Sequence, residues 1–501
     1  MKACILLQNQ YCKIGHALAS VLKEEYGVTE FSAYVFSRGA AEFVKSRTDI
    51  QYSPVLIDHE LHHNFTNEAL DIEYIRQFEK TYGTPQLWQY FYSDRKLMMS
   101  MGPKEETTAV LDPLYSHEDL LRIFQVRAKA IEQMLKESRP DFILFFAIGA
   151  LGHMILYHVA KKMGIPTYNI DFPRVANRMC VSQDFNTLTE VVDTFEIFQK
   201  EKQETHYHAE ARELIQHFRK TGSLRLQYLS IALGQLPKPI RIFNPKHILR
   251  SLTYIVTLSQ NYFKSRGLFE YGMTSVNPLR FIWYKLKQYV RSIRGLDHFY
   301  QPLTWDEKFV FFPLHYEPEL AILLLSPYYF DQITLIRYIA QSLPLDYKLY
   351  VKEHPAMVSK RKNQYYKELL KIPNVRLVDH GISGFEFIKR AKLITTITGT
   401  SGWEASIYGK PVITFGNVFY NALPFVTRAR DMEKLPAIIH DKLTNFKYDE
   451  NAMNNFTAAV LKKSVPFDFS NLWYEDDIEK LKKDSGLRAF CELLMETIRK
   501  S

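Results

Sequence analysis

The chain has 501 residues and a mass of 58.9 kDa, which is too long for one ordinary domain and predicts two or three. Hydrophobic residues make up 46% and charged residues 24% of it, a globular composition that excludes a disordered or fibrous chain. The four cysteines form no Cys-x-x-Cys or Cys/His cluster, so neither a disulfide scaffold nor a structural zinc site is expected. A reducing compartment fits this cysteine usage.

The N-terminal segment MKACILLQNQ has too short an apolar stretch for a signal peptide and predicts a first strand. Residues 142–160 are almost uncharged and near the length of a membrane span. Two glycines and two histidines interrupt them, which favours a buried strand, a glycine turn and a helix instead. We therefore expect no transmembrane helix.

Strand and helix patterns alternate over residues 1–200, which predicts a parallel sheet flanked by helices. The strands are expected at Ala3–Leu7, Ala33–Phe36, Val55–Ile57, Phe142–Ala147 and Thr167–Ile170. The helices are expected at Gly15–Glu25, Asp71–Tyr82, His117–Glu137 and Gly152–Met163. Residues 201–304 lose the alternation and predict a helical insertion that is broken by prolines.

From residue 305 the alternation returns and predicts a second doubly wound sheet. Its strands are expected at 308–314, 347–352, 375–379, 392–397 and 411–416, with helices at Asp331–Ser342, Ser359–Lys371, Gly384–Arg390 and Ser401–Gly409. The fold class is therefore α/β. Its expected parts are a Rossmann-like domain over 1–200, the helical insertion over 201–304, a second Rossmann-like domain over 305–430 and a helical extension over 431–501. Ligands of such sheets bind at the carboxyl ends of the strands, here in a cleft between two facing domains.

The net charge of +9 is concentrated in one stretch, residues 238–294, which hold eleven Lys/Arg and one acidic residue, Glu270. Ten aromatic residues are interleaved with these cations. This combination favours an anionic membrane surface, because cations meet lipid phosphates while rings enter the headgroup zone. A solvated helical insertion with inward-packed aromatics is the alternative, and nucleic acid is the competing partner. No nucleic-acid-binding motif accompanies the stretch, so we do not expect nucleic acid to be a partner.

A small-residue loop, Thr398–Glu404, follows the fourth strand of the second sheet and opens a helix. Its backbone amides and the helix N-terminus suit an anion, and the Thr400 and Ser401 hydroxyls add donors. Glu404, one turn into the helix, could accept hydrogen bonds from a ribose hydroxyl pair. The alternative is a capping box, in which Ser401 and Glu404 only satisfy helix-terminal amides.

His354-Pro355 follows the second strand of the same sheet, beside Lys352. The imidazole could bind a phosphate or protonate a leaving phosphate oxygen, and the lysine adds a cation. The alternative is a histidine that only caps its own loop. Asp331, which opens the helix after the first strand, could border the same pocket or simply be a helix N-cap. The parallel strands bring these loops to one rim.

In the first domain, Arg174, Asn177 and Arg178 follow the strand that ends near Asp171 and face the predicted cleft. Two guanidinium groups suit an anionic acceptor or a donor carboxylate, and a solvated loop is the alternative. Asp171 is the first candidate for a general base. Asp94 is the second.

Several of these segments resemble the capsule polysaccharide synthesis family of bacterial glycosyltransferases. The resembling residues in the second domain are YKLYVKEHP and ITGTSGWEASIYGKPVITFGNVFY. Those in the first domain are YGTPQLWQYFYSDRKLM and the stretch from PDFILFFAIG to VSQD. The resemblance covers roughly residues 80–180 and 305–425.

The resemblance implies a GT-B glycosyltransferase, with a nucleotide-activated sugar on the C-terminal domain and a saccharide or lipid-linked acceptor on the N-terminal one. Several members of this group use CMP-activated acidic sugars such as Kdo, and the His-Pro motif is similar to theirs. By this resemblance His354 would contact the donor phosphate, Thr400 and Ser401 the phosphate or base, and Glu404 the ribose. No Asp-x-Asp occurs, which agrees with a site that needs no metal, and no cofactor is implied.

The expected function is therefore transfer of a sugar to a cell-surface polysaccharide or glycolipid, by a peripheral protein on the cytoplasmic face of the membrane. Two alternatives stay open. One is a non-catalytic, sugar-nucleotide-binding scaffold of a capsule assembly complex. The other is a polyol-phosphate transferase of the teichoic-acid type.

Overall fold

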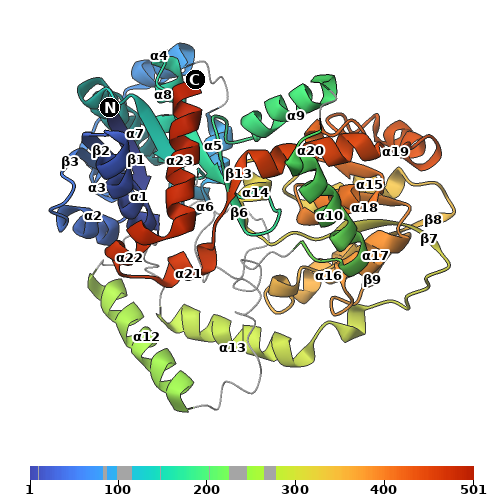
Figure 1. Cartoon of the computed structure of the whole chain (residues 1–501). Helices are drawn as coiled ribbons and strands as arrows, with labels where there is room; N and C mark the ends of the chain where they lie inside the picture. The colour runs from blue at the N-terminus through green and yellow to red at the C-terminus, as the bar shows by residue number, and fades with distance from the viewer. Residues whose placement is uncertain are drawn as a thin grey trace.

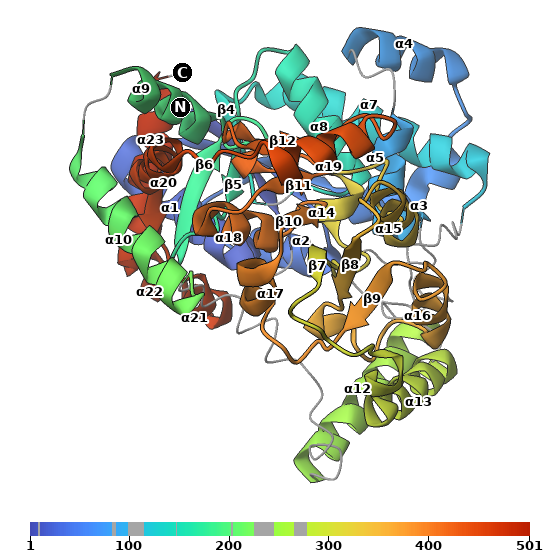
Figure 2. The same cartoon turned by 90° about the vertical axis from the view of Figure 1, so that its right-hand side faces the viewer.

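The computed structural model consists of two α/β lobes side by side, with two long helices at one end of the molecule (Figure 1 and Figure 2). Both chain termini lie on the N-terminal lobe. The structure describes residues 1–8, 11–82, 87–98, 115–146, 148–201, 204–224, 245–264 and 278–500. Parts of the predicted basic stretch, residues 238–244 and 265–277, lie outside this set, as do residues 83–86 and 147.

The N-terminal sheet has seven strands in the order β13-β6-β5-β4-β1-β2-β3. Strands β1 to β5 run parallel, while β6 pairs antiparallel with both β5 and β13. The strands are β1 Lys2–Leu7, β2 Glu30–Val35, β3 Tyr52–Ile57, β4 Phe142–Phe145, β5 Thr167–Asp171, β6 Arg178–Ser182 and β13 Ser464–Pro466. The central strands β1 and β4 are buried almost throughout, as expected of strands covered on both faces.

The C-terminal sheet has six parallel strands in the order β12-β11-β10-β7-β8-β9. They are β7 Lys308–Pro313, β8 Tyr347–Lys352, β9 Val375–Val378, β10 Leu393–Thr396, β11 Val412–Thr414 and β12 Val426–Arg428. In each sheet the chain order reverses next to the first strand, between β1 and β4 and between β7 and β10. Such switch points form the ligand crevices of open α/β sheets. The predicted fold of two Rossmann-like domains with a helical insertion is confirmed.

Helices cover both sheets and connect them. The helices before β6 are α1 Tyr11–Tyr26, α2 Arg38–Lys45, α3 Asp58–Asn64, α4 Ile72–Tyr82, α5 Trp88–Ser93, α6 Arg95–Met98, α7 His117–Ser138 and α8 Leu151–Lys162. The helices between the two sheets are α9 Thr189–Glu201, α10 His206–Thr221, α12 Pro245–Lys264 and α13 Pro278–Arg294. Short 3-10 turns are η1 Phe65–Asn67, η3 Asp297–Phe299, η4 Pro355–Met357 and η5 Phe419–Ala422.

The remaining helices follow β7. They are α14 Leu320–Leu323, α15 Gln332–Gln341, α16 Asn363–Leu369, α17 Gly384–Arg390, α18 Thr400–Tyr408, α19 Leu435–Thr444, α20 Glu450–Lys462, α21 Phe469–Tyr474, α22 Ile478–Lys483 and α23 Ser485–Lys500. Helix α18 ends at Gly409, whose φ of 85° lies in the left-handed region that favours glycine.

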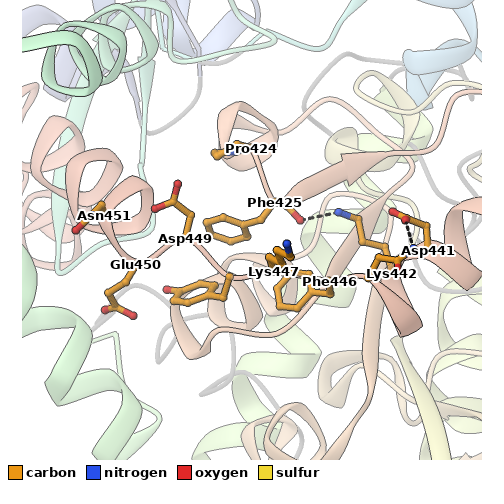
Figure 3. A pocket seen from close by; sticks show the side chains of 11 residues that line it. Pro424, Phe425, Asp441, Lys442, Phe446, Lys447, Asp449, Glu450 and Asn451 are labelled. Atoms are coloured by element: carbon orange, nitrogen blue, oxygen red, sulfur yellow. Dashed lines mark hydrogen bonds between the residues drawn. The ribbon is translucent and has the colours of Figure 1, made fainter.

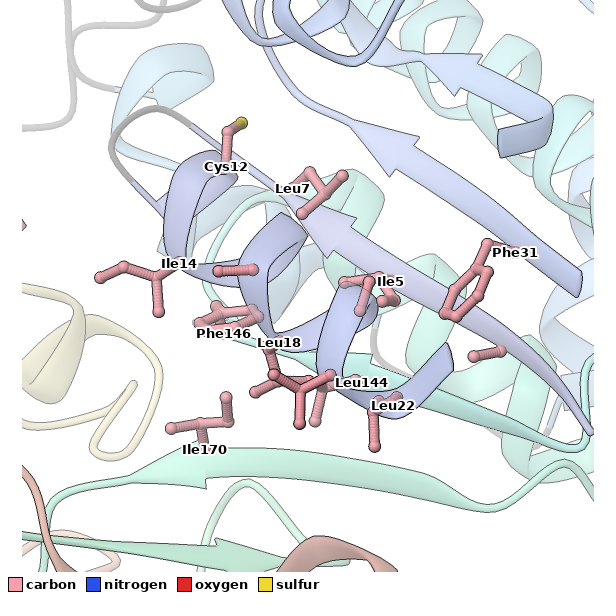
Figure 4. Close-up of a cluster of buried hydrophobic side chains, with 14 of the residues drawn as sticks. Ile5, Leu7, Cys12, Ile14, Leu18, Leu22, Phe31, Leu144, Phe146 and Ile170 are labelled. Carbon is pink, nitrogen blue, oxygen red and sulfur yellow. The ribbon is translucent and has the colours of Figure 1, made fainter. Parts of the chain in front are cut away.

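The N-terminal core forms where α1 packs on β1, β2 and β4. Leu18 and Leu22 of α1 lie against Ile5 and Leu144 of the strands (Figure 4). The apolar residues of α1 recur at helical spacing, so one face of the helix points to the sheet. The C-terminal helices complete this core, through Leu487, Phe490, Cys491, Leu494 and Met495 of α23.

The segment after residue 431, predicted as a helical extension, divides between the two lobes. Phe456 and Ala459 of α20 join a core cluster with Phe195 and Ile215 of α9 and α10. Strand β13 then adds to the N-terminal sheet, and α21 to α23 pack on that lobe. The chain therefore crosses back to its first domain, and the predicted domain boundaries stay a prediction.

Candidate functional site

Three loops meet at the carboxyl edge of the C-terminal sheet, beside the switch point between β7 and β10. They span residues 313–319, 352–361 and 398–404, and we call them together the C-terminal rim. His315 Nε2 accepts a hydrogen bond from the Thr398 amide at 3.2 Å, and Arg361 donates to the His315 carbonyl at 2.6 Å. The structure thus brings together the His354 and Thr398–Glu404 loops, which the sequence analysis assigned to one rim, with the loop over 313–319.

Helix α18 presents its amide end to this rim. Its N-cap is Gly399, which makes no side-chain cap hydrogen bond, and Ser401 lies within the first turn. The capping box of Ser401 and Glu404 is therefore not how this helix begins. A Cβ at position 399 would lie 2.6 Å from Thr396 Oγ1, so only glycine allows this close turn. The partial positive charge of the helix N-terminus is left for an anion.

His354 is the N-cap of the η4 turn, because its Nδ1 accepts from the Ala356 amide at 3.2 Å. In a neutral ring this bond leaves the proton on Nε2. Burial lowers the pKa of His354 to about 4, although the carboxylate of Glu353 opposes the shift. At neutral pH the ring is thus uncharged, which favours donation of a hydrogen bond to a phosphate over donation of a proton.

Lys352 ends β8 next to this turn, and its side chain is buried. Burial lowers the pKa of its ammonium group, against the opposing charges of Glu353 and Asp379. Within the described residues, no hydrogen bond or salt bridge holds this ammonium group. Its predicted role as a donor-binding cation stays a prediction.

A buried network of charged side chains holds the His354 turn. Arg361 Nη1 lies 2.5 Å from Glu353 Oε1, and Arg361 Nη2 lies 3.2 Å from Glu317 Oε2. The Tyr366 hydroxyl donates to the other Glu353 oxygen at 2.7 Å. Glu353 also accepts from the His354 amide at 2.6 Å, so the network fixes the backbone of the turn.

Sequence reasoning missed this network. The carboxylate in KEHP was visible, but its partner Arg361 lies in a segment that the sequence predicts as part of a helix, Ser359–Lys371. In the structure α16 begins only at Asn363, which leaves Arg361 buried at the end of the second loop of the rim. A buried ion pair depends on three-dimensional contacts, so no local sequence pattern predicted this network.

His315, in the loop that follows β7, was also missed. Burial lowers the pKa of His315 to about 3, and the positive charges of Arg174 and Arg361 add to the shift. The neutral ring accepts from the Thr398 amide through Nε2 and so positions the turn that enters α18. Its contribution is therefore to hold the small-residue loop.

Arg174 reaches across from the N-terminal domain to this loop. Its Nη1 donates to the Thr398 carbonyl at 3.0 Å and to the Thr400 hydroxyl at 3.3 Å. Its backbone φ is 56°, in the left-handed region, and Ala176 in the same loop has a φ of 31°. Such strain in non-glycine residues clusters at functional sites. The sequence assigned Arg174 to an acceptor or anion site, and the structure places it against the α18 end.

Two further contacts close the same side of the cleft. Arg95 Nη1 donates to the Pro318 carbonyl at 3.0 Å. A Cβ at Gly149 would lie 2.4 Å from Leu320, so the two domains approach closely there. The rim therefore faces the carboxyl edge of the N-terminal sheet, as the predicted cleft requires.

Asp171 lies at the end of β5, open to solvent, and accepts from the Phe172 amide at 2.6 Å. Its carboxylate lies within the electrostatic reach of the Arg174 guanidinium. Asp94 differs, because it is buried and accepts from the amides of Leu151 at 2.9 Å and Lys96 at 3.0 Å. Of the two carboxylates, Asp171 is thus the one that interacts with Arg174. Asp94 instead caps the start of α8.

Three predicted residues have other partners. Arg178 donates to Ser464 Oγ at 2.9 Å and to the Leu461 carbonyl at 3.0 Å, and so fastens the segment that crosses back. The Asn177 carbonyl accepts from the Phe467 amide of the same segment. Asp331 caps α15 by accepting from the amides at 333 and 334. The contacts described for these residues are not the ones that Arg174 makes.

Glu404 lies partly buried one turn into α18, near Arg174. Burial raises the pKa of Glu404 to about 7, and the guanidinium of Arg174 opposes the shift. Among the described residues no hydrogen bond to its carboxyl occurs. Its carboxyl is therefore available to a ligand.

The raised pKa of Glu404 predicts a pH-dependent stability. The folded protein keeps this proton up to a pH of about 7, whereas the unfolded chain releases it near the ordinary value of 4.5. The free energy of unfolding should therefore fall as pH rises from 4.5 to 7. This component should be absent from Glu404→Gln and present in the exposed control Glu118→Gln. Denaturant unfolding at a series of pH values measures it, and equal slopes in both variants would contradict the assignment.

Comparison with known proteins gives one family match. Residues 253–440 match the family model described as "Capsule polysaccharide biosynthesis protein". The curated Protein FixF of Sinorhizobium fredii (strain NBRC 101917 / NGR234) is 28% identical over 142 residues, which are 28% of this chain and 34% of that protein. The chain thus spans about a third of the length of this curated relative.

Solved structures of low similarity were also found. The β-Kdo 2,7 transferase of Thermosulfurimonas dismutans KpsC is 13% identical with a TM-score of 0.37, covering 74% of this chain and 89% of that one. The KpsC β-Kdo 2,4 transferase is 12% identical with a TM-score of 0.35, covering 68% and 86%. UDP-GlcNAc 2-epimerase from Neisseria meningitidis is 13% identical with a TM-score of 0.25 and full coverage of both chains.

The family match spans α13 and all three loops of the C-terminal rim. It therefore includes every C-terminal residue that the sequence analysis selected for chemistry. This match agrees with the resemblance to the capsule polysaccharide synthesis proteins predicted from the sequence, over less than half of the chain.

Proposed function

We propose that this protein is a glycosyltransferase of capsule or related cell-surface polysaccharide synthesis. It moves a sugar from a nucleotide-activated donor, for which a CMP-linked acidic sugar such as Kdo is the first choice, to a saccharide or lipid-linked acceptor. The observation that carries the proposal is the contact of Arg174 with Thr398 and Thr400. It puts a guanidinium from one domain at the uncapped helix end of the other, where a donor phosphate fits.

In this reaction an acceptor hydroxyl attacks the anomeric carbon, the bond from that carbon to the phosphate oxygen breaks, and the hydroxyl proton passes to a base. The protein has to stabilise charge on the departing phosphate. The α18 amide end, Thr400, Ser401 and the Arg174 fork supply donors, and Lys352 adds a cation. His354 contributes its Nε2–H. Asp171 is the proposed base, and Glu404 the acceptor for ribose hydroxyls.

Thermal shift against a panel of nucleotide sugars tests donor binding. A bound donor raises the melting temperature by mass action, so one nucleotide class should stabilise the protein more than the others. CMP-sugars, UDP-sugars and a CDP-polyol form the panel, and the last of them represents the polyol-phosphate alternative. Arg174→Ala should lose most of the shift. If no member of the panel shifts the wild-type protein, donor binding is refuted.

Transfer is expected to need no divalent metal ion. The positive charge that a metal would supply to a departing phosphate is available here from Arg174, Lys352 and the α18 N-terminus. The chain also lacks an Asp-x-Asp sequence. Excess EDTA should therefore leave the rate of transfer largely unchanged. Loss of transfer in EDTA, with recovery on adding Mg²⁺ or Mn²⁺, would contradict this expectation.

We also propose that the protein attaches to an anionic membrane surface through α13, which refines the membrane assignment made for residues 238–294. Six large apolar side chains of α13 are exposed: Leu279, Ile282, Trp283, Leu286, Val290 and Ile293. Their spacing puts them on one helix face. The opposite face is docked, with Gln288 donating to Ser359 at 3.4 Å and Arg291 to the Lys360 carbonyl at 3.0 Å.

Cations flank this exposed stripe. Lys287 lies over the Trp283 ring with its Nζ 5.3 Å from the ring centroid, and Arg294 ends the helix. Each cation near an anionic surface contributes about 1 kcal/mol, and the apolar stripe can enter the headgroup region. Among the helices of the described residues, none has the length and hydropathy of a membrane span. The attachment proposed is therefore that of a helix lying in the plane of the interface.

Vesicle flotation measures this attachment. Wild-type protein should float with anionic vesicles and much less with neutral ones. Trp283→Glu combined with Leu286→Glu should reduce flotation at least tenfold, because two charges would enter the apolar zone. Leu345→Glu, on a fully exposed apolar residue of the C-terminal lobe, is the control and should float like wild type. Wild-type protein that stays at the bottom of the gradient at low salt would end the membrane proposal.

A further inference from the structure

A cavity of about 590 Å³ lies on the C-terminal lobe, apart from the rim. It is bounded by the end of α19, the loop from Asn445 to Asp449, the start of α20 and the chain before β12. None of its lining residues belongs to the three loops of the C-terminal rim. Its volume lies within the range of small-ligand sites, about 300–1,000 Å³.

Three aromatic rings form the apolar wall of this cavity. The ring centroid of Phe425 lies 4.9 Å from that of Tyr448 and 6.4 Å from that of Phe446. Phe425 is buried, while Phe446 and Tyr448 are half-buried and so present part of their surface. The wall is held in place, because Arg219 donates to the Tyr448 hydroxyl at 3.0 Å and Lys442 to the Phe425 carbonyl at 2.9 Å. The rings meet at steep angles, with planes 60° and 82° from that of Phe425, so an angled apolar wall is preformed.

Polar side chains surround the rings. In Figure 3, Asp449, Glu450 and Asn451 lie on one side of Phe425 and Phe446, and Asp441 and Lys442 on the other. Carboxylates accept hydrogen bonds from the hydroxyl groups of a ligand, and side-chain amides both donate and accept them. Asn445 already donates to Asp441 at 3.0 Å, which orients both side chains.

The charges around the cavity balance. Asp441, Asp449 and Glu450 supply three negative charges, while Lys442, Lys447 and Arg219 supply three positive charges, and Arg219 pairs with Glu450 at 2.8 Å. An acidic polymer would meet the carboxylates without a surplus of cations. A membrane surface does not fit this site, because the site is a cavity and charged side chains surround its aromatic wall. A metal ion finds no group of three ligand side chains in the described residues.

We propose that this cavity is a second binding site, which takes a neutral saccharide chain. The apolar C–H face of a pyranose ring would stack on Phe446 and Tyr448, while its hydroxyls bond to Asp441, Asn445 and Asn451. The inference rests on the proposed function, since a transferase of cell-surface polysaccharide has glycan at hand. A chain held here would stay near the cleft between turnovers, which raises its effective concentration.

Affinity electrophoresis and saturation-transfer NMR on the full chain test this site without any donor. The neutral probes are maltoheptaose, cellohexaose and a β-galactan, and polygalacturonate is the acidic probe. At least one neutral probe should bind wild type, with the strongest transfer to aromatic protons. Phe446→Ala should weaken binding by about tenfold, the size of one lost ring contact. Asn451→Ala, made separately, should weaken it by a similar factor, the size of one lost hydrogen bond. Tyr328→Ala, at an exposed tyrosine that does not line the cavity, should bind like wild type.

The outcomes separate this proposal from the proposed function. His354→Ala should keep saccharide binding while losing transfer, and Phe446→Ala should transfer to a short acceptor at the wild-type rate. The second site would be overturned if no neutral probe bound the wild-type protein. It would also be overturned if Phe446→Ala and Asn451→Ala bound the neutral probes as tightly as wild type, or if polygalacturonate bound more tightly than the neutral probes. Lack of transfer by the wild-type protein would instead count against the glycosyltransferase proposal and leave the binding result standing.

Discussion

Replacing His354 by alanine is expected to slow sugar transfer by about 10²–10³-fold, the usual cost of removing one donor aimed at developing negative charge. The neutral ring caps its own turn through Nδ1 at 3.2 Å and keeps Nε2–H for the leaving phosphate. Glutamine retains an N–H donor of similar reach, so His354→Gln should recover part of the rate. Steady-state kinetics with matched melting temperatures measure both variants.

The pH profile identifies what His354 does. Because burial lowers the pKa of His354 to about 4, a hydrogen-bond donor stays competent across neutral pH. A proton donor would instead lose activity as pH rises through that pKa. Between pH 6 and 8 the loss of rate in His354→Ala relative to wild type is therefore expected to be independent of pH. A folded His354→Ala protein that transfers sugar at the wild-type rate would contradict the assignment of His354 to the site.

Replacing Arg361 by methionine is expected to destabilise the protein by about 3–5 kcal/mol, because it leaves the Glu317 and Glu353 carboxylates buried without their cation. Methionine preserves most of the volume, so the loss reports on charge rather than on a cavity. The destabilisation should grow with pH, since unpaired buried carboxylates can hold protons at low pH but become charged at higher pH. Denaturant unfolding at pH 5 and pH 8 measures it.

A surface ion pair gives the matched control. Arg122 pairs with Asp119 at 2.9 Å on the outside of α7. Arg122→Met should cost at most about 1 kcal/mol, because exposed pairs are screened by water and salt. If Arg361→Met were no more destabilising than Arg122→Met, the buried network would not be what holds the His354 turn.

The sequence predicted the fold well where strands are buried on both faces. The strand over 347–352 agrees with β8, and the strand over 308–314 with β7 to within one residue. Strands β6, β12 and β13 were missed. The last two are three residues long, and β13 contains Pro466, so neither has the continuous apolar run that marks a buried strand.

The candidate site was predictable only as far as local patterns reach. His354, Thr400 and Glu404 follow from loops at strand ends, and the structure places all three at the rim. Arg174 was selected for the right chemistry, but only the folded chain brings it to Thr398. Arg361 and His315 act through partners 8 and 83 residues away, so no local pattern contained them.

A transfer assay with the full chain tests the central claim most directly. The protein, anionic vesicles and a saccharide acceptor panel are incubated with CMP-sugars, UDP-sugars and a CDP-polyol, and products are identified by mass spectrometry. We predict that one nucleotide sugar is consumed and its sugar appears on an acceptor, and that Arg174→Ala and His354→Ala both lose this product. Nucleotide-sugar binding without turnover on any acceptor, or transfer of a polyol phosphate in place of a sugar, would contradict it.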